Sequence, residues 1–279
     1  MELKEEYILY GVGGAAERFI FCNGDILEKI KLCIDDNRKE FYKIPVYKLK
    51  EAEVNRGGTQ VIVAAGDEKI YNEMKQNLIN LGLVEFEDFI WSKVFRKKIV
   101  VVNANCHGPA VINYLQLSPT FCKVYMVYPV PEIHLNNEIP HNLLKNADVY
   151  IHQDIRENNS ISYKLSDAYI CPQLKPNAIS ICIPNFVGMG TWMFPSLGGL
   201  DRVMHTLTGP WYILYRDYVL DEAVNKCESL DEYRAFWINY KFDSTEHERN
   251  FDECMNKLSQ REKNWDIKIY EFIKGYHVL

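Results

Sequence analysis

The alternation of apolar and polar positions divides the chain into two halves that each begin with alternating strands and helices. In the first half, the pattern predicts a strand, a turn and a helix over 7–22, a strand ending in acidic residues within 29–47, a strand at 59–66, an amphipathic helix at 67–83 and a short closing element at 85–91. Strands that alternate with helices indicate βαβ units and a parallel sheet.

The second half starts the same pattern again after a charged stretch at 91–98, which we interpret as a domain boundary. It predicts strands at 98–102, 122–130, 148–155 and 177–186, helices at 109–115 and 136–147, and mainly helix from about residue 200 onward. We therefore predict an α/β fold: an N-terminal Rossmann-like parallel-sheet domain over 1–95, and a second α/β domain over 96–279 with a helical C-terminal part.

Composition and charge narrow the class of protein. The 279 residues are 47% hydrophobic and 25% charged with a net charge of −6, which is typical of a soluble globular protein and argues against nucleic-acid binding. No apolar run reaches the roughly 18 residues of a membrane span, and the charged N-terminus is not typical of a signal peptide. The 8 dispersed cysteines contain no CxxC pair, so we expect a cytoplasmic protein. The oligomeric state, including a homo-oligomer, stays open.

A glycine-rich turn joins the first strand to the first helix. Gly11, Gly13, Gly14 and Arg18 lie there, and Asp35 ends the second strand about 20 residues later, where an acid binds a ribose in dinucleotide-binding folds. This spacing favours a nucleotide or sugar nucleotide as ligand, or else only close packing of strand and helix; both readings stay open. Residues 5–90 resemble the small Rossmann-like domain that precedes sugar acyltransferase modules.

The junction of the strand at 98–102 with the following helix combines groups suited to acyl transfer. Cys106 and His107 are neighbours there, Asn103 and Asn105 supply amide donors, and Pro109 occupies the first helical turn. A helix N-terminus favours a thiolate, and amide donors stabilise an oxyanion. A packed cysteine at a strand end is the plain alternative. Zinc binding is disfavoured, because adjacent Cys-His is poor ligand spacing and no second cysteine accompanies it.

Residues 98–279 resemble the WcbI-type capsular polysaccharide biosynthesis family, a family of coenzyme A-dependent acetyltransferases of bacterial surface glycans. Four stretches carry the likeness in the right order: NANCHG at 103–108, NADVYIHQDI at 146–155, ICIPNFVGMGTWMFPSLGG at 181–199 and LSQREKNWDIKIYEFI at 258–273. The chain departs from the family pattern at Ala104, where the family has glycine, and at His107, where it has glutamine.

The resemblance implies roles for individual residues. It makes Cys106 the nucleophile or the thioester-side group, Asn105 its neighbour beside the oxyanion, and Gln153 a polar strand-end group that faces the same pocket. His107 and His134 compete for the role of general base. His152 precedes Gln153 on the strand and should therefore face the opposite side of the sheet.

The function we predict is acetyl or acyl transfer from coenzyme A, or acetyl-coenzyme A, to a hydroxyl of a glycan or sugar-nucleotide acceptor during capsular polysaccharide assembly. Lys175 is a candidate partner for the phosphates of coenzyme A. Two alternatives stay open. One is a cysteine-dependent glycan esterase, which would lack affinity for coenzyme A; the other is a non-catalytic sugar-nucleotide-binding module, which would tolerate loss of Cys106.

Overall fold

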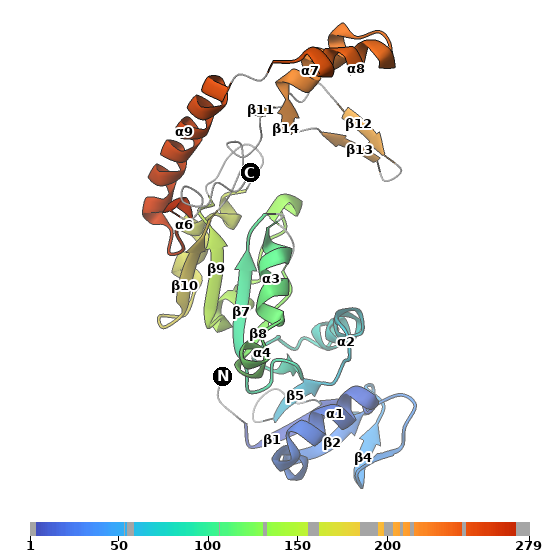
Figure 1. Ribbon diagram of the computed structural model, residues 1–279. Helices are drawn as coiled ribbons and strands as arrows, with labels where there is room; N and C mark the ends of the chain where they lie inside the picture. The colour runs from blue at the N-terminus through green and yellow to red at the C-terminus, as the bar shows by residue number, and fades with distance from the viewer. Residues whose placement is uncertain are drawn as a thin grey trace. The chain divides into compact units, whose positions relative to one another are not determined.

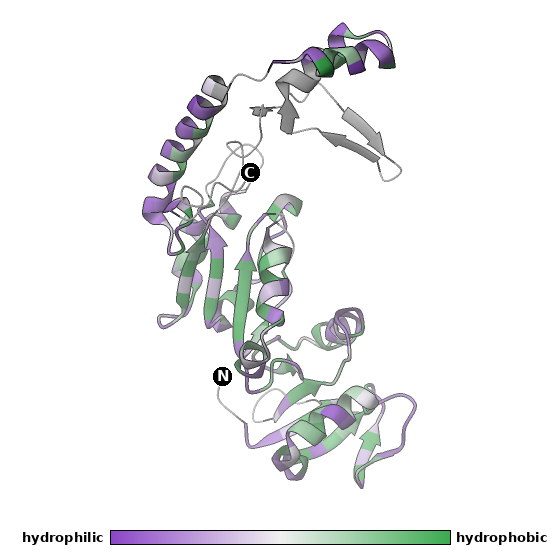
Figure 2. Ribbon diagram, in the orientation of Figure 1, coloured by the Kyte–Doolittle hydropathy of each residue, from purple (hydrophilic) through white to green (hydrophobic). Residues whose placement is uncertain are grey.

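The apolar run after residue 97 forms β7 (Lys98–Asn103), a central strand of a four-stranded sheet ordered β10-β9-β7-β8 (Figure 1). β7 pairs in parallel with β8 (Tyr125–Val127) and with β9 (Val149–Gln153), and β10 (Ile179–Ile183) lies beyond β9. Five of its six residues are buried, and Figure 2 shows β7 as a hydrophobic strand. Burial on both faces explains why its sequence is continuously apolar rather than alternating.

The computed structural model describes residues 4–52, 54, 59–105, 107–130, 133–155, 162–184, 195–197, 203–206, 209–212, 215–241 and 244–271. It divides into two units, Met1–Ile181 and Cys182–Leu279. Within the described residues, no helix is long and apolar enough to span a membrane.

The N-terminal part of the first unit forms a six-stranded sheet in the order β3-β4-β2-β1-β5-β6. Its strands are β1 (Glu6–Tyr10), β2 (Ile30–Ile34), β3 (Glu40–Phe41), β4 (Ile44–Tyr47), β5 (Thr59–Val63) and β6 (Phe89–Trp91). All neighbouring strands are parallel except β3 and β4, which form an antiparallel pair. The connecting helices are α1 (Gly14–Cys22), η1 (Gly24–Lys29) and α2 (Glu68–Asn80). The predicted alternation of strand and helix is thus confirmed.

Short helices connect the strands of the second sheet. They are α3 (Gly108–Gln116), α4 (Pro119–Val124), η2 (Ile133–Leu135), α5 (His141–Asn146), η3 (Tyr163–Leu165), α6 (Asp167–Ile170) and η4 (Cys171–Gln173). The strand expected over 122–130 is shorter than predicted, because its first residues belong to α4. Ser118 caps this helix by accepting a hydrogen bond from the Phe121 N–H, and Pro119 occupies its first turn.

The two sheets of the first unit share one hydrophobic core. Phe95, in the segment between them, packs edge-on against Tyr7 and Phe19 of the first sheet and its helix. The predicted boundary at 95/96 therefore falls where the chain passes from one sheet to the other, inside a continuous core. The division into separate domains at residues 95/96 stays a prediction.

A buried carboxylate also links the two sheets. Glu85 accepts hydrogen bonds from the hydroxyl groups of Tyr71 on α2 and Tyr128 just after β8, and it pairs with Lys75. Burial is the largest cause that raises the pKa of both tyrosines. A charge buried at this depth is stable because three donors compensate it.

The second unit is helical toward its C-terminus, as predicted, but its helices begin at Tyr218 rather than at about residue 200, because short strands occupy 203–206, 209–212 and 215–217. It contains β11 (Pro195–Leu197), β12 (Val203–Thr206), β13 (Gly209–Tyr212), β14 (Tyr215–Asp217), α7 (Tyr218–Lys226), α8 (Leu230–Asn239), α9 (Ser244–Arg261) and η5 (Glu262–Asn264). β11 pairs with β14 and β12 with β13, both antiparallel. A small core joins Cys182 to Met255, Leu258 and Trp265.

Candidate functional site

The carboxyl ends of β7 and β9 bring polar residues together at one edge of the second sheet. The two strands are parallel with Asn103 opposite His152, so the residues that follow β7 meet the last residue of β9. The Asn105 N–H donates a hydrogen bond to Oε1 of Gln153 at 3.0 Å. Gln153 is only 2% exposed, so its amide is held inside the protein and directed at this turn.

His107 is held against the same turn by Asn105. The His107 N–H donates to Oδ1 of Asn105 at 3.0 Å, and Nδ1 of the imidazole lies 2.8 Å from the same oxygen. Because that oxygen is an acceptor, Nδ1 carries the proton in the neutral ring. The lone pair then belongs to Nε2, the nitrogen that a general base needs. Gln153 Nε2 lies 3.5 Å from Nδ1, too far for a strong hydrogen bond.

The turn leads directly into α3. Gly108 is the first residue of this nine-residue helix, His107 is its N-cap, and Pro109 lies in its first turn. The unpaired N–H groups of a first turn attract negative charge. Cys106 lies outside the described residues, between the described Asn105 and His107. The side chain of His134, in η2, lies outside them as well.

Asn103, which the sequence suggested as a second amide donor for an oxyanion, has other partners. Its Nδ2 donates to the Tyr150 hydroxyl at 2.7 Å and to the Leu165 carbonyl at 3.2 Å. Asn103 is buried, and burial raises the pKa of Tyr150 well above its usual range. Both amide hydrogens of Asn103 thus form hydrogen bonds within the core, and Asn105 is the asparagine at the turn.

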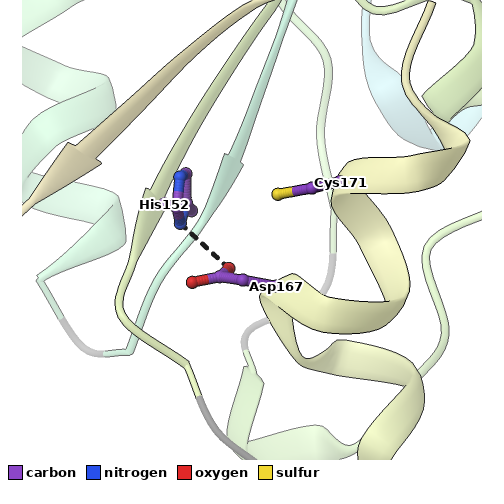
Figure 3. Close-up of side chains that lie close together, drawn as sticks. All are labelled: His152, Asp167 and Cys171. Atoms are coloured by element: carbon purple, nitrogen blue, oxygen red, sulfur yellow. Dashed lines mark ion pairs between the residues drawn. The ribbon is translucent and has the colours of Figure 1, made fainter. Parts of the chain in front are cut away.

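His152 lies away from Gln153 in a second polar group, shown with Asp167 and Cys171 in Figure 3. Its Nδ1 lies 2.9 Å from Oδ1 of Asp167 and 3.1 Å from the Gln153 carbonyl. Its Nε2 lies 2.9 Å from the Ser180 hydroxyl. Since both neighbours of Nδ1 are acceptors, the proton of the neutral ring is on Nδ1, and Nε2 accepts from Ser180.

This second group contains ligand types that zinc uses. One nitrogen, one carboxylate oxygen and one sulfur lie within 4.8 Å of one another. Binding a metal through Nδ1 would require removal of the proton that Nδ1 directs at the Gln153 carbonyl in the assigned tautomer. Burial and the Asp167 charge also raise the pKa of the Cys171 thiol, which keeps the sulfur protonated. We therefore interpret this group as a hydrogen-bonded network that supports the end of β9.

The predicted ligand residues of the first sheet occupy the turn after β1 and the end of β2. Gly11 has φ of 88° and donates to the Ile34 carbonyl, and a Cβ there would lie 3.1 Å from the Ala64 oxygen, so this position requires glycine. Gly13 and Gly14 do not experience such crowding. Asp35 accepts the Val12 N–H at 3.1 Å, which fixes the glycine turn.

The two basic residues that were predicted to bind a ligand, Arg18 and Lys175, lie in different parts of the first unit. Arg18 lines a cavity of about 610 Å³ beside α1. Lys175 pairs with Asp148 at 2.6 Å, and Asp148 in turn accepts the Ile99 N–H at 2.7 Å. Ile99 lies at the amino end of β7, so the structure does not bring Lys175 to Asn105. Lys93, Lys97 and Lys123 also line the cavity and were not predicted as ligand residues; the charged stretch at 91–98 was the available sequence signal for Lys93 and Lys97.

Comparison with known proteins adds three findings. The sequence model of a family described as "Polysaccharide biosynthesis enzyme WcbI" matches residues 99–277. No curated protein matches the chain. A solved structure of WcbI, described as the native protein without a disulfide bond between coenzyme A and a cysteine, has a TM-score of 0.51 and 18% sequence identity. The match covers 64% of this chain and 60% of that one, and at this identity it shows a shared fold.

Proposed function

The chain belongs to the WcbI family of polysaccharide biosynthesis enzymes, and we propose that it transfers an acyl group from coenzyme A to a sugar hydroxyl. The observation that carries this proposal is the group formed by Asn105, His107 and Gln153 at the turn whose sequence includes Cys106. That arrangement supplies a base, amide donors and a helix N-terminus at one turn.

In the first step of the proposed reaction, Cys106 attacks the carbonyl carbon of the thioester. The Cys106 proton passes to Nε2 of His107, the nitrogen that holds the lone pair in the assigned tautomer. The bond between the carbonyl carbon and the coenzyme A sulfur breaks, and the departing thiolate takes the proton from His107. The acyl group is then bound to Cys106 as a new thioester.

In the second step, the acceptor hydroxyl attacks the Cys106 thioester. His107 Nε2 accepts the hydroxyl proton while the sugar oxygen bonds to the carbonyl carbon, and the Cys106 sulfur leaves. The side-chain amide of Asn105 is the donor suited to the oxyanion of both steps, and the dipole at the N-terminus of α3 adds a favourable positive potential. Gln153 holds the Asn105 backbone and so acts as a positioning residue.

Coenzyme A is supported as the donor by the solved WcbI structure, whose description pairs coenzyme A with a cysteine. The acetyl group, the sugar acceptor and the link to a capsule are parts of the proposal. We also propose a cytoplasmic location, where the donor is available. The described cysteines Cys22, Cys33, Cys122, Cys171, Cys182 and Cys227 are not in disulfides, which suits a reducing compartment.

The test combines calorimetry with mass spectrometry on the full chain. We expect micromolar binding of coenzyme A, and a mass increase of one acetyl group on Cys106 when acetyl-coenzyme A is mixed with protein and quenched in acid. Cys106→Ala should abolish the increase, and Cys227→Ala, at a half-buried cysteine far along the chain, should retain it. Absence of binding at millimolar coenzyme A would refute the proposal. Binding without an acyl-cysteine would refute the covalent step.

A further inference from the structure

A second site is indicated by a cavity of about 610 Å³ in the first unit. One wall is a face of α1 that includes Ala15, Arg18 and Cys22, spaced as on one side of a helix. Gly66, which follows β5, and Ser92, which follows β6, contribute another wall. The volume lies in the roughly 300–1,000 Å³ range of small-molecule sites.

The wall of this cavity is strongly basic. Five cationic side chains line it: Arg18, Lys93, Arg96, Lys97 and Lys123. None of its lining residues, all within the described part of the chain, is acidic. The chain as a whole has 38 acidic and 32 basic residues, so this concentration runs against the net charge of −6. Like charges gathered in a concave wall repel one another, and an anion removes that repulsion.

Two of the cations have partners and show how the wall is built. Arg96 pairs with Asp25. Lys93 lies over the Trp91 ring, with Nζ 4.6 Å from its centroid. The exposed Arg18 guanidinium lies between two strand ends. Its Nη1 is 3.9 Å from the position that a Cβ atom on Gly14 would occupy, and its Nη2 is 3.8 Å from the corresponding position on Gly66. It therefore faces the backbone after β1 and after β5.

The topology places this guanidinium where open parallel sheets bind ligands. β1 lies between β2 and β5 in the sheet. The chain runs from β1 to β2 on one side, and from β5 to β6 on the other side. The crevice at such a switch point, beyond the carboxyl ends of the strands, is the usual ligand site in this architecture. Arg18, Gly14 and Gly66 all lie at that edge.

We propose that this cavity binds a small molecule bearing a phosphate or diphosphate group, of the class of nucleoside diphosphates and phosphorylated sugars. The site is separate from the acyl-transfer turn. Lys97 precedes β7 and Asn105 follows it, and a strand of six residues spans about 20 Å. The inference therefore does not depend on the acyl-transfer reaction.

Calorimetric titration of the full chain with uridine diphosphate, inorganic pyrophosphate and uridine tests the inference at low salt. We expect micromolar binding of uridine diphosphate that weakens as salt is added, and no binding of uridine. Arg18→Gln should weaken binding at least tenfold. Lys69→Gln is the matched control, because it removes one positive charge from the exposed face of α2, outside this cavity, and should leave binding unchanged.

Two results would overturn the inference: no binding of uridine diphosphate or pyrophosphate at millimolar concentration, or equal weakening by Lys69→Gln. Pyrophosphate that binds as tightly as uridine diphosphate supports the inference with the diphosphate as the recognised group. Cys106→Ala should not change these affinities, which separates this test from that of acyl transfer.

Discussion

Gln153 and Asn105 are 48 residues apart in the sequence and are joined by a 3.0 Å hydrogen bond from the Asn105 N–H to Oε1 of Gln153. The contact exists because β7 and β9 are parallel neighbours that end at the same edge of the sheet. It fixes the backbone of the turn at the residue just before Cys106. The geometry of the turn therefore depends on a strand that contributes no reacting group in our proposal.

Replacing Gln153 with leucine tests this dependence. The variant keeps the volume but removes the acceptor, so we expect about 1–3 kcal/mol lower stability from the unpaired Asn105 N–H. We expect kcat/KM for acyl transfer to fall at least tenfold, because the turn is no longer held. Denaturant unfolding and steady-state kinetics measure the two effects. Gln76→Leu, at an exposed glutamine of α2 that bonds only to Asn80 among the described residues, should change neither. Unchanged kinetics in Gln153→Leu would contradict the positioning role.

His107 should supply the general base of the proposed reaction. His107→Gln keeps a donor for Oδ1 of Asn105 but has no nitrogen that accepts a proton, so we expect a rate loss of about 10²–10⁴ fold. Steady-state kinetics of the purified variants measure this loss. If His134→Gln lowers the rate by this factor and His107→Gln does not, the base is His134.

Much of the first unit follows from the local pattern of residues. β7 is apolar along its length because both of its faces are buried, and such runs are readable from sequence. The position of Gln153 was also predictable, since it follows from the alternation of side chains along β9 and from the shared edge of parallel strands. The N-terminal Rossmann-like classification, and any role of Asp35 toward a ligand, stay predictions.

Other features depend on contacts that no local pattern encodes. The cations of the cavity come from α1, the segment after β6 and α4, and only the folded chain brings Arg18, Lys97 and Lys123 together. The start of α4 was readable in principle from Ser118 and Pro119, but the apolar residues that follow suggested a longer strand. The continuous core on either side of residue 95 likewise depends on long-range packing.

The buried Glu85 network should make stability sensitive to alkaline pH. Burial, and next the Glu85 charge, raises the pKa of Tyr128. An unfolded tyrosine loses its proton near pH 10, whereas folded Tyr128 retains it to higher pH. The stabilisation is therefore complete below about pH 10 and is lost as the pH rises above it, by up to about 1.4 kcal/mol per pH unit for each such group.

Comparison of wild type with Tyr128→Phe measures this effect. We expect the variant to be less stable at pH 8, because Glu85 loses one of its donors, and its free energy of unfolding to fall less steeply between pH 10 and 11.5. Tyr163→Phe, at an exposed tyrosine, is the matched control and should leave the slope unchanged. A slope in Tyr128→Phe equal to that of wild type would contradict the assigned titration.

The thiols should differ in reactivity according to their surroundings. Burial, and next the Asp35 charge, raises the pKa of Cys33 to about 12, so this fully buried thiol should resist alkylation until the chain unfolds. Cys22 is exposed and should react with iodoacetamide at an ordinary rate. Cys106 should react fastest near neutral pH, because the first turn of α3 favours its thiolate.

The alkylation rates with and without coenzyme A are the decisive comparison. If the donor thioester binds beside Cys106, saturating coenzyme A should slow alkylation of Cys106 at least tenfold while leaving Cys227, which does not line the cavity that includes Cys22, unchanged as an internal standard. Peptide mass spectrometry at several reaction times measures each rate separately. Protection of both cysteines would indicate a general change in the protein rather than an occupied site. Reaction of Cys106 at the slow rate of Cys33 would show a buried, packed thiol and contradict its role as nucleophile.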